Sequence, residues 1–154
     1  MTSGLRHVRR CCLKKDDSIY GHHNGLVVHS TGDNLFLTTE SDYLYVLSEG
    51  NNARILLDKW SMNNLILSYG DNSYIKSTSS SRIEVYGKGT SLHLTASNHA
   101  VKLTAGTEVY YAGKDWTAGT DFMADTYYTT NGKDFEFLGQ KAPLVENSTI
   151  CSIT

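Results

Sequence analysis

The chain has 154 residues, of which 40% are hydrophobic, 10% aromatic and 19% charged, and its formal net charge is −2. This composition is too apolar and too weakly charged for a disordered chain, and the net charge does not favour nucleic acid as a partner. No run of about 18 apolar residues occurs, so no membrane-spanning helix is expected. The length allows one compact domain or one elongated rod.

Residues 1–25 form a basic and irregular head. Arg6, Arg9 and Arg10 lie within a short span of positive charge that lacks interleaved aromatic residues for stacking on bases. We therefore interpret this head as a segment that docks on a partner protein, with these three arginines as the candidate docking residues. It contains no apolar stretch typical of a secretory signal.

The cysteines and histidines of the chain show no metal-binding pattern. The cysteines are Cys11, Cys12 and Cys151, an odd number without C-x-x-C spacing. Reduced structural cysteines are the preferred interpretation, and disulfides between chains are the alternative. The adjacent His22 and His23 would point to opposite faces of a strand, so a shared metal ion is not expected. No metal and no cofactor is predicted.

Residues 26–113 form an array in which two apolar residues, separated by one other residue, recur every 8 to 11 positions. Two residues that are two apart lie on the same face of a strand, and stretches rich in Gly, Asn, Asp and Ser separate the copies. In the later copies, Leu92, Leu94, Val101 and Leu103 are predicted to be buried and His93 and Lys102 to be exposed. The copies begin at Leu26, Leu35, Leu44, Ile55, Leu65, Tyr74, Ile83, Leu92, Val101 and Val109.

The array predicts an all-β fold, and three architectures fit it. Short strands at the spacing of these copies suit a sandwich or barrel, a single-chain solenoid, or an elongated β-helix in which three intertwined chains share one core. Two inward residues per strand make a thin core for one chain. We therefore expect the intertwined homotrimer first and the β-sandwich or barrel second.

The stretches 91–96 (SLHLTA) and 100–106 (AVKLTAG) resemble the shaft repeats of bacteriophage tail spikes and tail fibres, and are similar to the needles of contractile-tail central spikes. The resemblance covers residues 26–113. It implies a homotrimeric structural virion protein, a short spike, fibre or baseplate component that serves in host attachment or penetration. Such a protein is made in the host cytoplasm and resides in the phage tail. The His-x-His pair of piercing tips is missing here.

The resemblance also implies the partners of the chain. These are two further copies of itself, other virion proteins at the N-terminal side, and a glycan or protein of the host surface. Shaft repeats carry no catalytic residue, and no enzyme is predicted. Glu84 and His93 occupy equivalent positions in neighbouring repeats, where they could meet as an acid–base pair, but solvated residues on the outer face are the preferred interpretation.

Residues 114–154 form an aromatic and polar cap. Its rings could plug the open end of a rod, or they could contact a ligand at the tip. Trp116, Tyr127 and Tyr128 are the candidate tip-contact residues. The alternative function is that of a monomeric sandwich or barrel that binds carbohydrate through this aromatic end.

Overall fold

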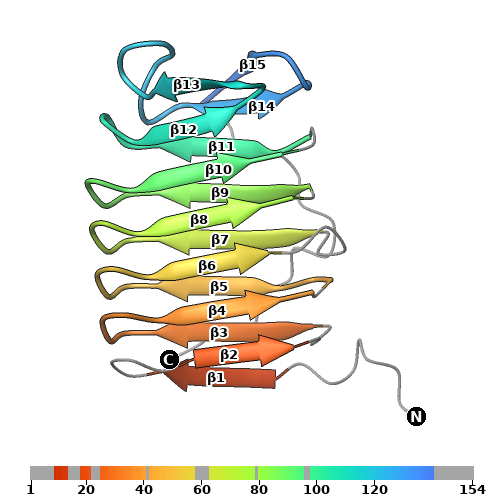
Figure 1. Cartoon of the computed structure of the whole chain (residues 1–154), viewed down its shortest axis with the longest axis vertical. Coiled ribbons are helices and arrows are strands. Elements are labelled where there is room, and N and C mark those ends of the chain that lie inside the picture. The colour runs from red at the N-terminus through yellow and green to blue at the C-terminus, as the bar shows by residue number, and fades with distance from the viewer. Residues whose placement is uncertain are drawn as a thin grey trace.

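The computed structural model describes residues 9–13, 18–21, 25–40, 42–57, 63–78, 80–95 and 98–140. All regular structure in these ranges is β-strand, and the chain winds into a β-solenoid. Figure 1 shows the strands stacked as rungs along the long axis of the molecule. Arg6, Cys151 and the rest of the predicted cap after residue 140 lie outside the described ranges.

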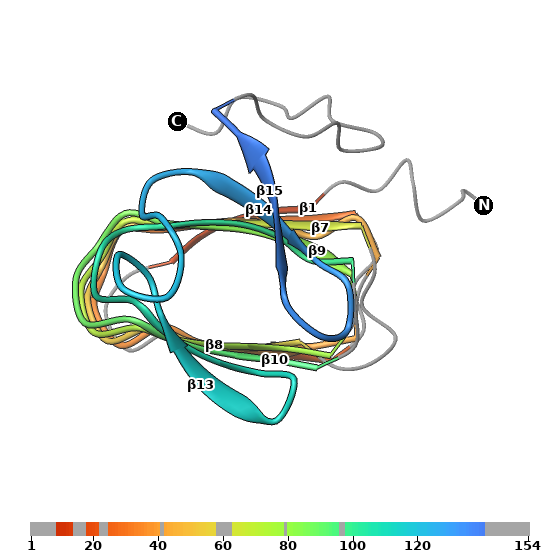
Figure 2. The same cartoon turned by 90° about the horizontal axis from the view of Figure 1, so that it is seen from above.

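Two sheets face each other across the solenoid, as the view along its axis shows (Figure 2). Sheet A has eight strands, which are in order β1 (Arg9–Leu13), β3 (Leu26–Ser30), β5 (Tyr45–Ser48), β7 (Asn64–Ser68), β9 (Ser81–Val85), β11 (Ala100–Leu103), β14 (Tyr127–Thr130) and β15 (Phe135–Gly139). Sheet B has seven, which are β13 (Lys114–Thr117), β12 (Glu108–Tyr111), β10 (Ser91–Leu94), β8 (Tyr74–Ser77), β6 (Arg54–Leu57), β4 (Phe36–Thr39) and β2 (Ser18–Gly21).

The predicted all-β, elongated β-helix is confirmed, and its coil comes from one chain. From β1 to β12, strands of sheet A alternate along the chain with strands of sheet B, and parallel pairing joins strands that are one coil apart. Tyr45 pairs with Leu65 and Asn64 with Ser81, so the chain completes one coil between each of these residues and its partner. The short apolar repeat of the sequence is therefore half a coil.

The core lies between the two sheets. Leu92 and Leu94 of sheet B and Val101 and Leu103 of sheet A are buried in it, as predicted. His93 and Lys102 lie on the outer faces, where they are only half-exposed. Because the inward residues of both sheets share one core, the two inward residues of each strand are enough to complete a coil without a strand from another chain.

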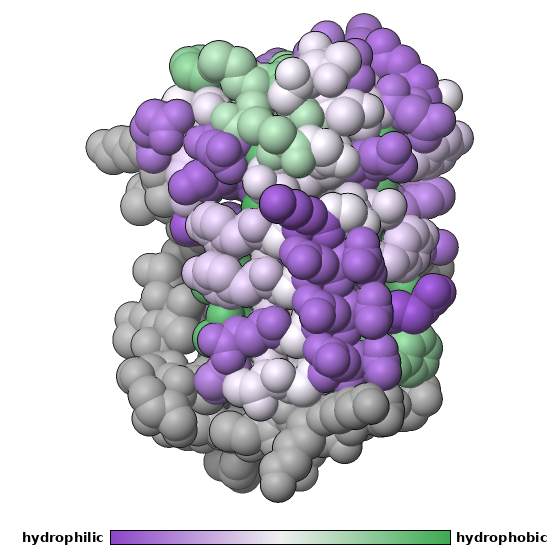
Figure 3. Space-filling view, turned by 90° about the vertical axis from the view of Figure 1, so that its left-hand side faces the viewer, coloured by the Kyte–Doolittle hydropathy of each residue, from purple (hydrophilic) through white to green (hydrophobic). Residues whose placement is uncertain are grey.

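The turns that follow the strands of sheet A are joined by a ladder of side-chain hydrogen bonds. The amide of Asn51 donates to Oδ1 of Asp33, and the amide of Asp71 donates to Oδ1 of Asn51, both over 2.8 Å. The amide of Lys88 continues the ladder to Asp71 Oδ1, also over 2.8 Å. Figure 3 shows hydrophilic residues gathered in a column along this side of the rod. The ladder fixes the register of successive coils at the turns.

A buried column of serines ends the first strands of sheet A. Ser48 and Ser68 are fully buried, and their Oγ atoms meet no hydrogen-bond partner in the described structure. At the same position in later coils the chain has Val85 and Leu103. The corner thus accepts apolar side chains, and its hydroxyls are not needed for the coil.

We therefore expect Ser68→Ala to leave thermal stability unchanged or to raise it, because a buried hydroxyl without a partner costs free energy. The matched control is Ser77→Ala, since the buried Oγ of Ser77 lies 2.8 Å from that of Ser81. The control should lose about 1 kcal/mol of unfolding free energy. Thermal melts followed by circular dichroism compare the two variants. A larger loss for Ser68→Ala than for Ser77→Ala would contradict this interpretation of the corner.

Candidate functional site: the C-terminal cap

Parallel coiling stops at the C-terminal end, where antiparallel strands close both sheets. Ala112 and Gly113 form a two-residue turn with positive φ at both positions, 56° and 78°, which suits a tight hairpin. β13 then pairs antiparallel with β12, and β14 pairs antiparallel with β11 and β15. Figure 2 shows that β13 and β15 leave the direction of the strands stacked below them. Another parallel coil therefore cannot continue from this end.

An aromatic cluster closes the core under these strands. The ring of Phe135 packs on Phe122 at 4.5 Å between centroids, on Trp116 at 5.0 Å and on Tyr111 at 5.1 Å. The indole nitrogen of Trp116 donates to the carbonyl of Tyr111 over 2.9 Å. The ring of Tyr128 meets Phe122 edge to face at 5.2 Å. These contacts support the plug interpretation of the cap.

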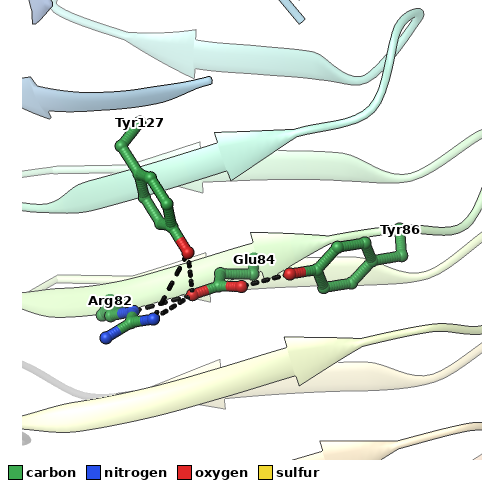
Figure 4. Close-up of polar contacts among 4 residues, drawn as sticks. All are labelled: Arg82, Glu84, Tyr86 and Tyr127. Atoms are coloured by element: carbon green, nitrogen blue, oxygen red, sulfur yellow. Dashed lines mark hydrogen bonds and ion pairs between the residues drawn. The ribbon is translucent and has the colours of Figure 1, made fainter. Parts of the chain in front are cut away.

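A carboxylate on the outer face of sheet A ties β14 to the solenoid (Figure 4). Oε2 of Glu84 accepts hydrogen bonds from Arg82 Nε at 2.8 Å and from the Tyr127 hydroxyl at 2.9 Å. The Tyr86 hydroxyl donates to Oε1. Lys102 of β11 pairs with Glu84 of β9 on one side and with Tyr127 of β14 on the other. The side chain of Tyr127 therefore extends across β11 and bonds to β9, the second strand from its own.

This environment keeps Glu84 ionised. Burial alone would raise the pKa of Glu84, but the hydrogen bonds from Tyr86, Arg82 and Tyr127 outweigh it and bring the pKa below its usual value. The same bonds engage both carboxylate oxygens and hold the side chain of Glu84 in place. Its geometry is that of a structural latch.

The position of Glu84 corrects a prediction. Glu84 was expected to be solvated on the outer face, but it is only 4% exposed. The side chains of Tyr86 and Tyr127 bond to it from outside its own strand. His93 lies on sheet B and Glu84 on sheet A, so the two cannot meet as an acid–base pair. The burial depends on Tyr127, which is distant in sequence, and no local pattern signals it.

The three predicted tip-contact residues lie mainly inside the cap. Tyr127 and Tyr128 are buried, and Trp116 is half-buried in the aromatic cluster. In the described part of the cap, up to residue 140, the large apolar side chains that are exposed are Met123 (54%), Phe137 (60%) and Leu138 (42%). Phe135 and Phe137 are two apart on β15 and so lie on the same face, where both rings meet Tyr128, at 6.3 and 5.7 Å between centroids. Only Phe135 reaches the aromatic cluster, and no local pattern signals the exposure of Phe137.

A shallow groove of about 390 Å³ opens beside the cap, where three turns meet at the end of sheet B. Tyr110 forms its exposed wall, and the ring of Tyr110 lies 4.9 Å from that of His93. Three small residues, Ala112, Gly113 and Gly132, also line it. The lining residues are Leu94, Thr95, Tyr110, Tyr111, Ala112, Gly113 and Gly132.

His99 lies buried where β14 meets the coil. Its ring Nε2 lies 2.7 Å from the carbonyl oxygen of Thr95, and its Nδ1 has no partner among the described groups. The amide of His99 donates to Oγ1 of Thr130, the last residue of β14, and the amide of Thr130 donates to the carbonyl of His99, both over 2.9 Å. Burial lowers the pKa of His99, and the bond to Thr95 only partly opposes this.

Because the folded pKa of His99 is lowered, the unfolded chain binds the proton more readily, and stability is lost as pH falls below the unfolded value of about 6.5. We expect a loss of up to about 1.4 kcal/mol per pH unit in that range. His99→Gln should remove this loss, whereas His93→Gln, a half-exposed control, should keep it. Urea melts at pH 7.5 and 5.5 measure the difference. Equal pH dependence in His99→Gln and wild type would contradict the assignment.

The described residues hold no group of three His, Cys, Asp or Glu that could bind a metal ion. Within the same ranges, no helix is long and apolar enough to cross a membrane. Comparison of the chain with protein-family models, curated proteins and solved structures found no match. The functional inference therefore depends on the geometry of the solenoid and its two ends.

Proposed function

We propose that the protein is a non-catalytic attachment element, a short spike or fibre component of a tailed phage that docks by its N-terminal side and makes contact through its cap. The observation that carries this proposal is the difference between the two ends. In the described structure, β1 and β2 end the two sheets as parallel strands at one side, whereas antiparallel strands close both sheets at the other. A connector between two different partners needs two dissimilar ends.

The continuous hydrogen bonding between successive coils suits a mechanical role. Every described strand from β3 to β12 is bonded on both sides within its sheet, and the turns are bonded by the asparagine and aspartate ladder. Such a body transmits force along its axis with few free strand edges. The most buried carboxylate among the described residues, Glu84, is saturated with hydrogen bonds, which favours a structural over a catalytic use of the polar residues.

The phage tail is proposed from the resemblance of residues 91–106 to tail spike and tail fibre shafts, with the virion as the site of action. We retain the homotrimer as part of this proposal, with three self-contained coils associating through their outer faces. Arg9 and Arg10 belong to β1 and so lie at the side proposed to dock on other virion proteins. Size-exclusion chromatography with light scattering tests the trimer, which requires about three times the 17.1 kDa mass of the chain.

The attachment role is tested with two double variants in a phage that carries the gene. Arg9→Ser/Arg10→Ser should reduce the amount of the protein in purified particles. Phe137→Ser/Leu138→Ser should leave incorporation intact and reduce adsorption to host cells. Antibody detection of the protein and counting of unadsorbed particles give the two readouts. Absence of wild-type protein from the particle, or normal adsorption with the cap variant, would refute the proposal.

Carbohydrate binding is a second candidate, favoured by the groove beside Tyr110. An exposed tyrosine ring in a groove that small residues also line suits a sugar ring, which stacks on the tyrosine. Binding of the labelled protein to a panel of bacterial polysaccharides tests this function. It requires that Tyr110→Ala abolish the signal and that Tyr69→Ala, an exposed tyrosine outside the groove, preserve it.

A further inference from the structure

β15 combines an edge that no described strand pairs with and exposed apolar side chains. It stands last in the order of sheet A, so only its edge toward β14 is bonded by a described strand. Two of its own residues, Phe137 and Leu138, are 60% and 42% exposed. An edge of this kind is normally protected by Pro, Lys or a cover of other residues, and Phe135–Gly139 contains neither Pro nor Lys.

The cap around this edge is acidic. Residues 112–140 contain two lysines against five acidic residues, which gives a formal charge of −3. The acidic residues are Asp115, Asp121, Asp125, Asp134 and Glu136. Glu136 lies on β15 itself, where its Oε2 accepts a hydrogen bond from Asn131 over 2.7 Å. Positive charge on an incoming chain is therefore favoured over negative charge.

We infer that the cap binds an extended polypeptide segment of a partner protein, rich in Lys or Arg and apolar at alternate positions, which adds to the free edge of β15 as a further strand. The backbone of the segment would supply the hydrogen bonds of a sheet, and its apolar side chains would cover Phe137 on one face. Its cationic side chains would lie on the other face, which carries Glu136 and Leu138. This inference rests on the proposed function, because it names the chemistry of the partner at the contacting end. A second copy of the chain fits less well, since pairing two β15 strands brings together two acidic caps.

The test uses the full-length protein and a fluorescent peptide, acetyl-Lys-Val-Thr-Val-Lys-Val-Thr-Val-amide. Two control peptides are the same sequence with every backbone amide N-methylated, which removes the donors from both edges of the strand, and the sequence with Glu in place of Lys. We expect anisotropy to show binding of the first peptide alone. Phe137→Ser/Leu138→Ser should weaken it about tenfold, the effect of removing an interface anchor. Tyr69→Ser, at an exposed tyrosine outside the cap, should have no effect.

Hydrogen exchange of the amides of residues 135–139 locates the peptide. Protection that appears only with the lysine peptide supports strand addition. Protection already present in the free monomer would show that the chain itself covers this edge, and protection that depends on a dimer would assign the edge to a second copy. Either result overturns the inference, as does equal binding of the N-methylated peptide. If the cap variant loses host adsorption while no peptide binds, the proposed function stands and this inference fails.

Discussion

Gly70→Ala is expected to unfold the protein or to lower its unfolding free energy by at least about 3 kcal/mol. The physical reason is the distance between successive coils. A Cβ at Gly70 would lie 1.8 Å from the carbonyl oxygen of Gly50, and one at Gly87 would lie 1.9 Å from that of Gly70. The obstacle is backbone, which cannot rotate away as a side chain can. The coils would have to separate and break the hydrogen bonds of the neighbouring strands.

The matched control is Gly113→Asn in the β12–β13 hairpin. A Cβ at Gly113 meets no atom within 4 Å, and its φ of 78° is one that Asn tolerates. We expect this variant to lose less than about 1 kcal/mol. Urea melts followed by circular dichroism measure both variants. A Gly70→Ala protein with wild-type stability would mean that the coils are not stacked at the spacing described here.

Glu84→Gln is expected to lower the unfolding free energy by about 2 to 4 kcal/mol, because it leaves the partly buried guanidinium of Arg82 without its counter-charge. Tyr127→Phe removes a single bond to the same carboxylate and should lose about 1 kcal/mol. In both variants, hydrogen exchange should quicken in β14 and β15 before it quickens in β5 and β7, since the latch holds the cap strand.

Two comparisons make the Glu84 prediction specific. Glu108→Gln, at an exposed carboxylate on β12, should change stability by less than about 0.5 kcal/mol. The pKa of Glu84 is lowered in the folded state, so its contribution is present above the unfolded value of about 4.5 and is lost as pH falls through the folded value. The stability gap between wild type and Glu84→Gln should therefore narrow below about pH 4. Equal unfolding free energies of wild type and Glu84→Gln at pH 7 would contradict the prediction and would show that solvent screens the interaction between Glu84 and Arg82.

The sequence predicts which residues of each strand face the core. It does not predict whether one chain or three chains form the coil. The alternation around Leu92 and Leu94 depends only on the two-residue period of a strand, and it holds in the structure. The choice between three shared chains and one self-contained coil depends on the turns. The stretches 30–34, 48–52 and 68–72 each read Ser-x-Gly, then Asp or Asn, then Asn. This longer repeat has the length of a full coil. It is harder to notice than the apolar repeat, which recurs twice in each coil.

The cap was less predictable than the coil because its contacts join residues distant in sequence. Tyr127 and Tyr128 are adjacent, yet one bonds outward to Glu84 and the other packs inward against Phe122. Both were predicted to lie at the tip because aromatic residues are common at binding surfaces. In the structure both tyrosines are buried instead, Tyr127 against Glu84 of β9 and Tyr128 against the rings of β15. These contacts form only when the cap folds.

The central claim is that one chain completes its own parallel coil and then closes it. Isotope-filtered nuclear Overhauser spectra test this claim on an equal mixture of labelled and unlabelled protein. Leu92 pairs with Ile75 of the preceding coil on one side and with Val109 of the following coil on the other. We predict that cross-peaks among these three residues occur within labelled chains and are absent between labelled and unlabelled chains. Cross-peaks found only between chains would show that the coil is shared by several chains, and would contradict the account.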